Sequence, residues 1–188
     1  MSSAFRISVA MMLMVAAFSH AAEGDPVAGK RKTVTCNACH GQSGFKSMPK
    51  LGGQSATYLT AALHAYKQDR RAHATMRDVA HALSERDIAD LAAHYAAVPK
   101  AVGESLATAP DVAGSCAACH GADGAQPAVP EVALIAGQSA GYLDQTLREY
   151  KSGVRPHPVM QEQVRELGDA QIVELVAWYA SQKGLSVK

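Results

Sequence analysis

Cys36-Asn37-Ala38-Cys39-His40 and Cys116-Ala117-Ala118-Cys119-His120 are the stretches that decide the fold of this 188-residue chain. Both have the Cys-x-x-Cys-His pattern by which c-type heme is attached to proteins. Within one helical turn, this spacing lets two thiols reach one edge of a porphyrin while the adjacent imidazole lies under the iron. The sequence therefore predicts two covalently bound hemes c, with thioether bonds at Cys36, Cys39, Cys116 and Cys119 and iron ligands at His40 and His120.

Three other uses of paired cysteines fit the sequence less well. A redox dithiol would place Cys-x-x-Cys inside a βαβ unit, and neither motif lies in a strand-like pattern. A four-cysteine zinc site would have to join the two motifs across a long segment, although each motif has its own histidine. Plain disulfides would not require a histidine after each cysteine pair. Heme attachment accounts for both motifs at once.

The chain is an internal duplication. Gly53-Gln54-Ser55 recurs as Gly137-Gln138-Ser139, and Tyr58-Leu59 recurs as Tyr142-Leu143, each 84 positions later (142 − 58 = 84). The two heme motifs are only 80 positions apart (116 − 36 = 80), so the second repeat has four extra residues between its motif and Gly137-Gln138-Ser139. Each repeat is therefore expected to bind one heme.

Both repeats have the apolar spacing of helices. The segments 58–67 and 87–98 repeat apolar residues at helical intervals. Ser84 and Asp25-Pro26 have the character of helix N-caps, as does Gly168-Asp169 in the second repeat. Sustained alternation of the strand type is absent. We predict an all-α fold of two tandem cytochrome c-like domains related by internal duplication.

Residues 1–21 have the layout of a secretory signal peptide. A short positive start precedes the apolar run 7–18, which is too brief to span a bilayer comfortably, and small residues follow it. An uncleaved membrane anchor is the alternative. Cleavage would release a mature protein to the periplasm, with domains at 22–98 and 99–188. Part of 99–110 is expected to belong to the first helix of the second domain.

Met76 and Met160 are the candidate distal ligands of the two irons. They are 84 positions apart (160 − 76 = 84), in predicted loops after the helices that begin with the repeated Tyr-Leu pairs. A lone methionine is usually core filler, but one duplicated at the same offset indicates a ligand. His73 and His157 each precede a methionine by three residues, so bis-histidine ligation stays open. Otherwise these histidines would hydrogen-bond a propionate or a loop carbonyl.

Pro49 and Pro130 follow the two heme motifs in polar loops that contain several glycines. A proline carbonyl that accepts the proximal imidazole N–H would fix the tautomer of the ring and raise its basicity. We predict this role for both prolines. Turn formation is the alternative reason for a loop proline.

The charge of the chain is nearly balanced, but its two halves differ. The formal net charge is +1, so nothing indicates a nucleic-acid partner. Residues 22–98 have ten basic and seven acidic side chains, whereas residues 99–188 have seven basic and ten acidic ones. This contrast of +3 against −3 is expected to orient the molecule between different partners.

With both heme motifs and the repeated helices identified, the chain resembles the class I diheme cytochromes of the cytochrome c4 family. The motifs that carry the resemblance are 36–40 with Met76 and 116–120 with Met160, and it covers essentially all of the chain after the leader. It implies two cytochrome c-fold domains related by pseudo-twofold symmetry, with heme propionates near the domain interface. The chain departs from the family in its short ligand loops and in the truncated first helix of its second half.

The resemblance also implies a function. Such a protein is a periplasmic electron carrier, not an enzyme, that takes single electrons from a quinol–cytochrome c reductase to a terminal oxidase or reductase. Peripheral association with the membrane is left open. One alternative is the cytochrome subunit of a dehydrogenase complex. Another is a diheme peroxidase, which would need an open sixth site on one iron, and the equivalent Met76 and Met160 argue against it.

Overall fold

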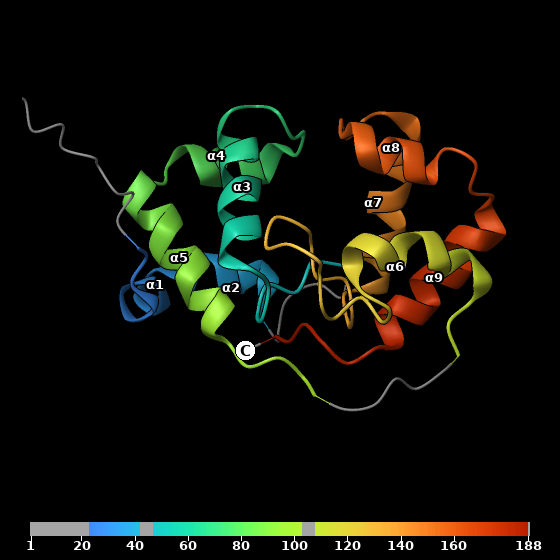
Figure 1. Cartoon of the computed structure of the whole chain (residues 1–188). Helices are drawn as coiled ribbons and strands as arrows, with labels where there is room; N and C mark the ends of the chain where they lie inside the picture. Colours follow the sequence, from blue (N-terminus) through green and yellow to red (C-terminus); the bar gives the residue numbers. More distant parts are fainter. Residues whose placement is uncertain (1–22, 42–46, 103–107, 188) are drawn as a thin grey trace, which may run out of the picture.

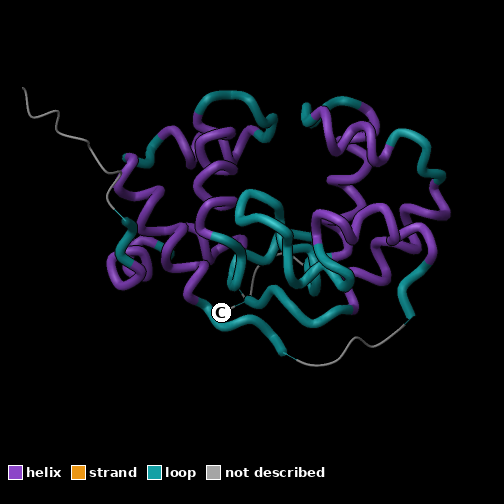
Figure 2. Tube along the Cα trace, in the orientation of Figure 1, coloured by secondary structure: helices purple, strands orange, loops and turns teal. Residues whose placement is uncertain are grey.

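The computed structural model describes residues 23–41, 47–102 and 108–187, so the predicted signal peptide lies outside the described residues. The described part of the chain consists of helices and loops and contains no named strand (Figure 2). Two helical groups lie on either side of a central region of loops (Figure 1). The predicted all-α fold and its tandem arrangement are confirmed.

The first half contributes the helices α1 (Pro26–Lys32), α2 (Val34–His40), α3 (Ala56–Lys67), α4 (Ala74–His81) and α5 (Glu85–Ala97). The predicted N-caps are confirmed. Asp25 Oδ1 accepts a hydrogen bond from the Val27 amide at 2.8 Å, and Ser84 and Asp87 form a capping box at the start of α5. These side chains satisfy backbone amides that the first turn of a helix leaves without a partner.

The second half contributes η1 (Asp111–Ala113), a 3₁₀ turn, and the helices α6 (Gly114–His120), α7 (Ala140–Ser152), α8 (Pro158–Val164) and α9 (Asp169–Ser181). The prediction of helix within 99–110 is wrong for the described residues of that segment. Residues 99–102 and 108–110 are not helical, and proline disfavours the helical conformation in the residue before it, here Ala109. The Ala101 amide instead donates to the Gly184 carbonyl at 2.8 Å.

Each half has its own apolar core, built from equivalent positions of the repeat. In the first half, α3 and α5 contribute Leu59, Leu91, Ala92 and Tyr95. The second-half core contains the equivalent Leu143, Leu175, Val176 and Tyr179. Cys36 packs against the first core and Cys116 against the second, so each heme motif lies at the edge of a core.

The C-terminal segment crosses back to the first half. Gly52 and Ser186 exchange backbone hydrogen bonds of 3.2 and 2.9 Å. This bridge joins the two halves along one edge. None of the described helices combines the length and the hydrophobicity needed to cross a bilayer.

Candidate heme sites

The proximal histidines lie at the ends of α2 and α6, and each has its Nδ1 on a backbone carbonyl. His40 Nδ1 donates to the Pro49 oxygen at 2.9 Å, and His120 Nδ1 donates to the Ala133 oxygen at 2.7 Å. A carbonyl can only accept, so Nδ1 carries the proton and Nε2 keeps its lone pair. Burial lowers the pKa of both imidazoles and outweighs the carbonyl contact, so the neutral form persists. Both rings are thus prepared as iron ligands.

The predicted role of Pro49 is confirmed, but the prediction for Pro130 is wrong. The carbonyl that accepts from His120 belongs to Ala133, which lies 84 positions after Pro49 (133 − 49 = 84). All four extra residues of the second repeat therefore lie between His120 and this carbonyl, and the sequence could not place them. The Pro130 carbonyl instead accepts from Ser55 Oγ at 2.6 Å, across the boundary between the halves.

None of the four cysteines forms a disulfide. They lie in pairs on α2 and α6: the first cysteine of each pair is one turn before the histidine, and the second directly precedes it. Throughout 23–41, 47–102 and 108–187, no three side chains of His, Cys, Asp or Glu gather as a metal-binding cluster, so the two pairs do not form the zinc site considered above. The thiols remain available for thioether bonds.

A cavity of about 490 Å³ lies beside the second heme motif. This volume is within the range of about 300–1,000 Å³ that is typical of cofactor pockets. Cys116, Cys119 and His120 line it, and so does Met160. Its other walls are largely apolar, with Ile135, Leu143, Leu147, Leu175 and Val176 from the second half and Tyr58, Ala61, Ala62 and Ala65 from α3 of the first. The residues present fit a heme.

Met76 and Met160 lie in the first turns of α4 and α8, where the sequence predicted loops. His73 and His157 are the N-caps of these helices. In each case the histidine Nδ1 accepts a hydrogen bond of 3.2 Å from the methionine amide. Both histidines are exposed, whereas both methionines are half-buried. The loop prediction was wrong because a histidine is not among the residues usually taken as a helix cap.

Two arginines and two tyrosines form contacts between the two halves, and sequence reasoning did not predict these contacts. We call Tyr58, Arg71, Tyr142 and Arg155 the Arg–Tyr cluster. Arg71 Nη2 donates to the Tyr142 hydroxyl at 2.8 Å, and an Arg155 nitrogen lies 3.5 Å from the hydroxyl of Tyr58. The pairs are 84 positions apart (155 − 71 = 84; 142 − 58 = 84), and this repeat spacing was the available signal.

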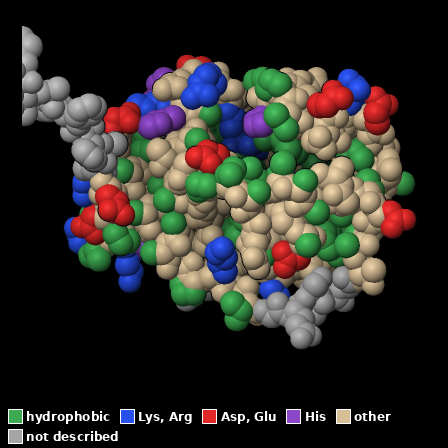
Figure 3. Space-filling model, viewed as in Figure 1, with side chains coloured by type: hydrophobic (Ala, Val, Ile, Leu, Met, Phe, Trp, Pro, Cys, Tyr) green, Lys and Arg blue, Asp and Glu red, His purple; other side chains and the backbone are tan. Residues whose placement is uncertain are grey.

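The two guanidinium groups of the cluster lie over aromatic rings. Arg71 is 4.5 Å from the ring centre of Tyr66, and Arg155 is 4.6 Å from that of Tyr150. Burial alone would raise the pKa of the Tyr142 phenol, but the charges and hydrogen bonds of both arginines outweigh burial and lower it to about 8. Figure 3 shows basic side chains within the hollow between the two halves.

No Asp or Glu among the described residues forms an ion pair with Arg71 or Arg155. Arg155 is buried and Arg71 is half-buried, and both line the cavity. Buried cations normally have an anionic partner. The carboxylates of heme propionates would supply such partners, so the charge of the cavity also fits a heme.

Comparisons with known proteins agree with this geometry. The chain is 30% identical to cytochrome c4 of Pseudomonas aeruginosa, over 96% of this chain and 92% of the relative. Its fold matches reduced cytochrome c4 from Pseudomonas stutzeri with a TM-score of 0.73 and 25% identity, covering 85% of this chain and 99% of that one. It is also 29% identical to the thiosulfate dehydrogenase electron acceptor of Thiomonas intermedia, over 86% of this chain and 85% of the relative.

No protein-family model matches the chain. The identity and coverage of the relatives are nevertheless sufficient, because they extend over both repeats and therefore over both heme motifs. The chain belongs to the cytochrome c4 family, and it is an electron-transfer cytochrome with two covalently bound hemes c, not an enzyme.

Proposed function

We propose that each iron has one histidine and one methionine as axial ligands, in a periplasmic carrier of single electrons. The assignment is thioether bonds at Cys36, Cys39, Cys116 and Cys119, with His40 and Met76 on the first iron and His120 and Met160 on the second. The observation that carries it is the cavity beside α6, which has His120 and Met160 among its lining residues. The sequence of the first half repeats these residue types, with His40 after the first Cys-x-x-Cys pair and Met76 84 positions before Met160.

Hydrogen bonding favours methionine over histidine as the distal ligand. Nδ1 of His157 accepts from the Met160 amide, so the proton of the neutral ring lies on Nε2. A protonated Nε2 has no lone pair for iron, and the same holds for His73. The two histidines instead hold the helix turns in which the methionines lie.

When bound, each heme supplies a one-electron iron couple, and its potential depends on the axial ligands and on burial. The residues of this chain keep the surroundings of that couple constant. The apolar side chains around the cavity exclude water, and the carbonyls of Pro49 and Ala133 hold the proximal rings. An environment that changes little between the two oxidation states suits rapid electron exchange.

Spectroscopy of paired variants tests the ligand assignment. We expect two hemes per chain in an alkaline pyridine assay, and a near-infrared sulfur–iron band in the ferric protein. Met160→Ala should remove about half of that band and allow rapid carbon monoxide binding to the reduced protein. His157→Ala is the matched control and should keep the band. Loss of the band in the control alone would show that the assignment is wrong.

The periplasm and the respiratory partners are the finer part of the proposal. It rests on the predicted leader at 1–21, on domains at 22–98 and 99–188, and on family membership. Electrons would enter from a quinol–cytochrome c reductase and leave to a terminal oxidase or reductase. Rapid reduction of the purified protein by the reductase, followed by oxidation by membranes that contain the oxidase, is the expected result. Failure of both reactions in the intact protein would contradict it.

A second candidate is the electron acceptor of a dehydrogenase. The match to a thiosulfate dehydrogenase electron acceptor favours it specifically. The two candidate functions predict different electron donors. Faster reduction of the protein by thiosulfate with a thiosulfate dehydrogenase than by the quinol–cytochrome c reductase would favour the second function. Co-purification with a catalytic subunit would select it as well.

A further inference from the structure

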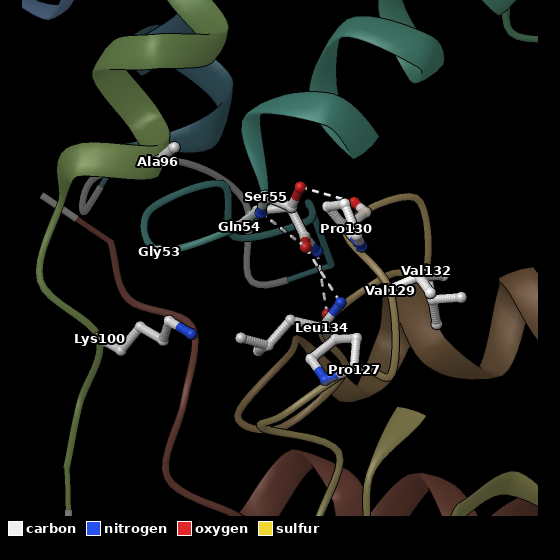
Figure 4. Close-up of a pocket in the computed structure, with 10 residues that line it drawn as sticks. All are labelled: Gly53, Gln54, Ser55, Ala96, Lys100, Pro127, Val129, Pro130, Val132 and Leu134. Carbon is white, nitrogen blue, oxygen red and sulfur yellow. Dashed lines mark hydrogen bonds between the residues drawn. The ribbon is translucent and has the colours of Figure 1, made fainter. Parts of the chain in front are cut away.

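Two buried glutamines, Gln54 and Gln138, reach across the boundary between the halves. They are equivalent in the repeat (138 − 54 = 84), and each is only 4% exposed. Gln54 Nε2 donates to the Leu134 oxygen at 3.0 Å, while its Oε1 accepts from the Leu134 amide at 3.0 Å. Gln138 makes the same pair of bonds to Lys50, at 3.1 and 2.7 Å. Figure 4 shows the Gln54 side chain pointing at the Leu134 backbone.

The peptide groups that these glutamines hold also contact the proximal histidines. The amide of Leu134 and the carbonyl of Ala133 belong to one planar peptide group. His120 Nδ1 donates to that carbonyl, and Gln54 Oε1 accepts from that amide. In the other half, the peptide group between Pro49 and Lys50 lies between His40 and Gln138 in the same way.

Each hydrogen-bond chain therefore begins on the proximal ring of one half and ends on a side chain of the other. Hydrogen bonds in series polarise one another, so an acceptor at the peptide amide makes the peptide carbonyl a better acceptor. A stronger bond at Nδ1 makes the imidazole a more basic ligand and fixes its orientation. The side chain of each glutamine is held in place, because its Oε1 also accepts from the backbone amide of the following residue. These distances are 3.0 Å from Ser55 and 2.7 Å from Ser139.

We propose that Gln54 and Gln138 are crossed positioning residues: each one tunes the proximal ligand, and hence the reduction potential, of the heme in the opposite half. The inference rests on the histidine ligation proposed above. The contacts between the two halves would then contribute to the surroundings of each heme. Both glutamines also line the cavity beside His120, so a change at the domain boundary would reach that heme site as well as the proximal peptide groups.

Replacement by an apolar side chain of similar length tests the crossing. In Gln54→Met the peptide amide of Leu134 loses its acceptor, so we expect the potential of the heme at His120 to rise while the other stays near its original value. Gln138→Met should raise the potential of the heme at His40 by more than that of the heme at His120, whose cavity Gln138 also lines. The two potentials come from redox titration, and hyperfine-shifted proton resonances assign each one to its histidine. Exchange of the affected imidazole N–H should accelerate about tenfold.

Two further variants distinguish an effect on the proximal histidine from a general weakening of the contact between the two halves. Ser55→Ala removes another bond across the boundary, the one to Pro130, which does not belong to a histidine-bound peptide group. It should leave both potentials unchanged. Gln54→Glu keeps an acceptor for the Leu134 amide, so the potential at His120 should stay at or below its original value, opposite to the effect of methionine.

Equal shifts of both potentials in each glutamine variant, or a shift in Ser55→Ala of the same size, would overturn the crossed assignment. So would a rise in potential in Gln54→Glu. These outcomes differ from a failure of the proposed ligation. In that case the unaltered protein itself would lack the sulfur–iron band or would not titrate as two hemes.

Discussion

In the first half, Asp90 accepts from the Asp25 amide at 2.8 Å and from Lys32 Nζ at 2.7 Å, and these contacts tie α1 to α5. The equivalent residue of the second half is the exposed Glu174 (90 + 84 = 174), and the described residues 108–113 before α6 contain only the short turn η1. The two halves therefore repeat the residues near the cofactor but differ at the face that α1 covers.

The second half has the larger apolar core. Trp178 lies in its core and is 6% exposed, whereas the equivalent residue in the first half is the half-buried His94 (94 + 84 = 178). A larger apolar side chain removes more surface from water when it is buried. One half therefore has a charged contact between helices, and the other has a larger core.

The largest predicted effect is at Trp178. Trp178→Ala should lower the free energy of unfolding by about 3–5 kcal/mol, because it removes a buried indole and leaves a cavity. Urea unfolding followed by circular dichroism measures the loss. His94→Ala is the matched control in the first half and should cost far less. Equal losses in the two variants would contradict the proposed difference between the cores.

The next effect is at the crossing of α1 and α5. Gly29 is buried there, and a Cβ at this position would lie 2.0 Å from the Asp90 carbonyl oxygen. Gly29→Ala should therefore destabilise the protein by about 1–3 kcal/mol through overpacking. Gly114→Ala is the control, since a Cβ there meets nothing within 4 Å. The same unfolding assay should find the control no less stable than the original protein.

A pH-dependent effect should arise at Asp90. Hydrogen bonds from Lys32 and the Asp25 amide, with the charge of Arg86, hold its pKa below the ordinary value of 3.8. A depressed pKa stabilises the fold above the ordinary value, and this contribution is lost as the pH falls below about 5. Thermal unfolding across this range should show that Asp90→Asn is less stable than the original at neutral pH. The difference should shrink in acid, and a constant difference would exclude this role.

The smallest effect should be electrostatic. Residues 22–98 carry +3 and residues 99–188 carry −3, counted from Lys, Arg, Asp and Glu. We expect electron exchange with an acidic redox partner and with a basic one to slow several-fold as salt rises, because salt screens attraction between exposed charges. Stopped-flow rates across a salt series measure this. Rates independent of salt for both partners would exclude orientation by the two halves.

The sequence by itself determined the two heme motifs, the all-α class and the caps at Asp25 and Ser84, because each depends on residues close together in the chain. It also determined the duplication, because matching segments can be compared directly at a constant offset. His40 and Pro49 were also paired correctly, since they are nine positions apart.

Only the tertiary structure decided the contacts between residues far apart in sequence. It placed Ala133 rather than Pro130 on His120, because a spacing pattern cannot locate a four-residue insertion within a loop. It also brought Gln54 to Leu134 across 80 positions and Arg71 to Tyr142 across 71. Such contacts follow from how the two halves dock, and docking depends on the shape and hydrogen-bonding groups of complete surfaces rather than on any local pattern.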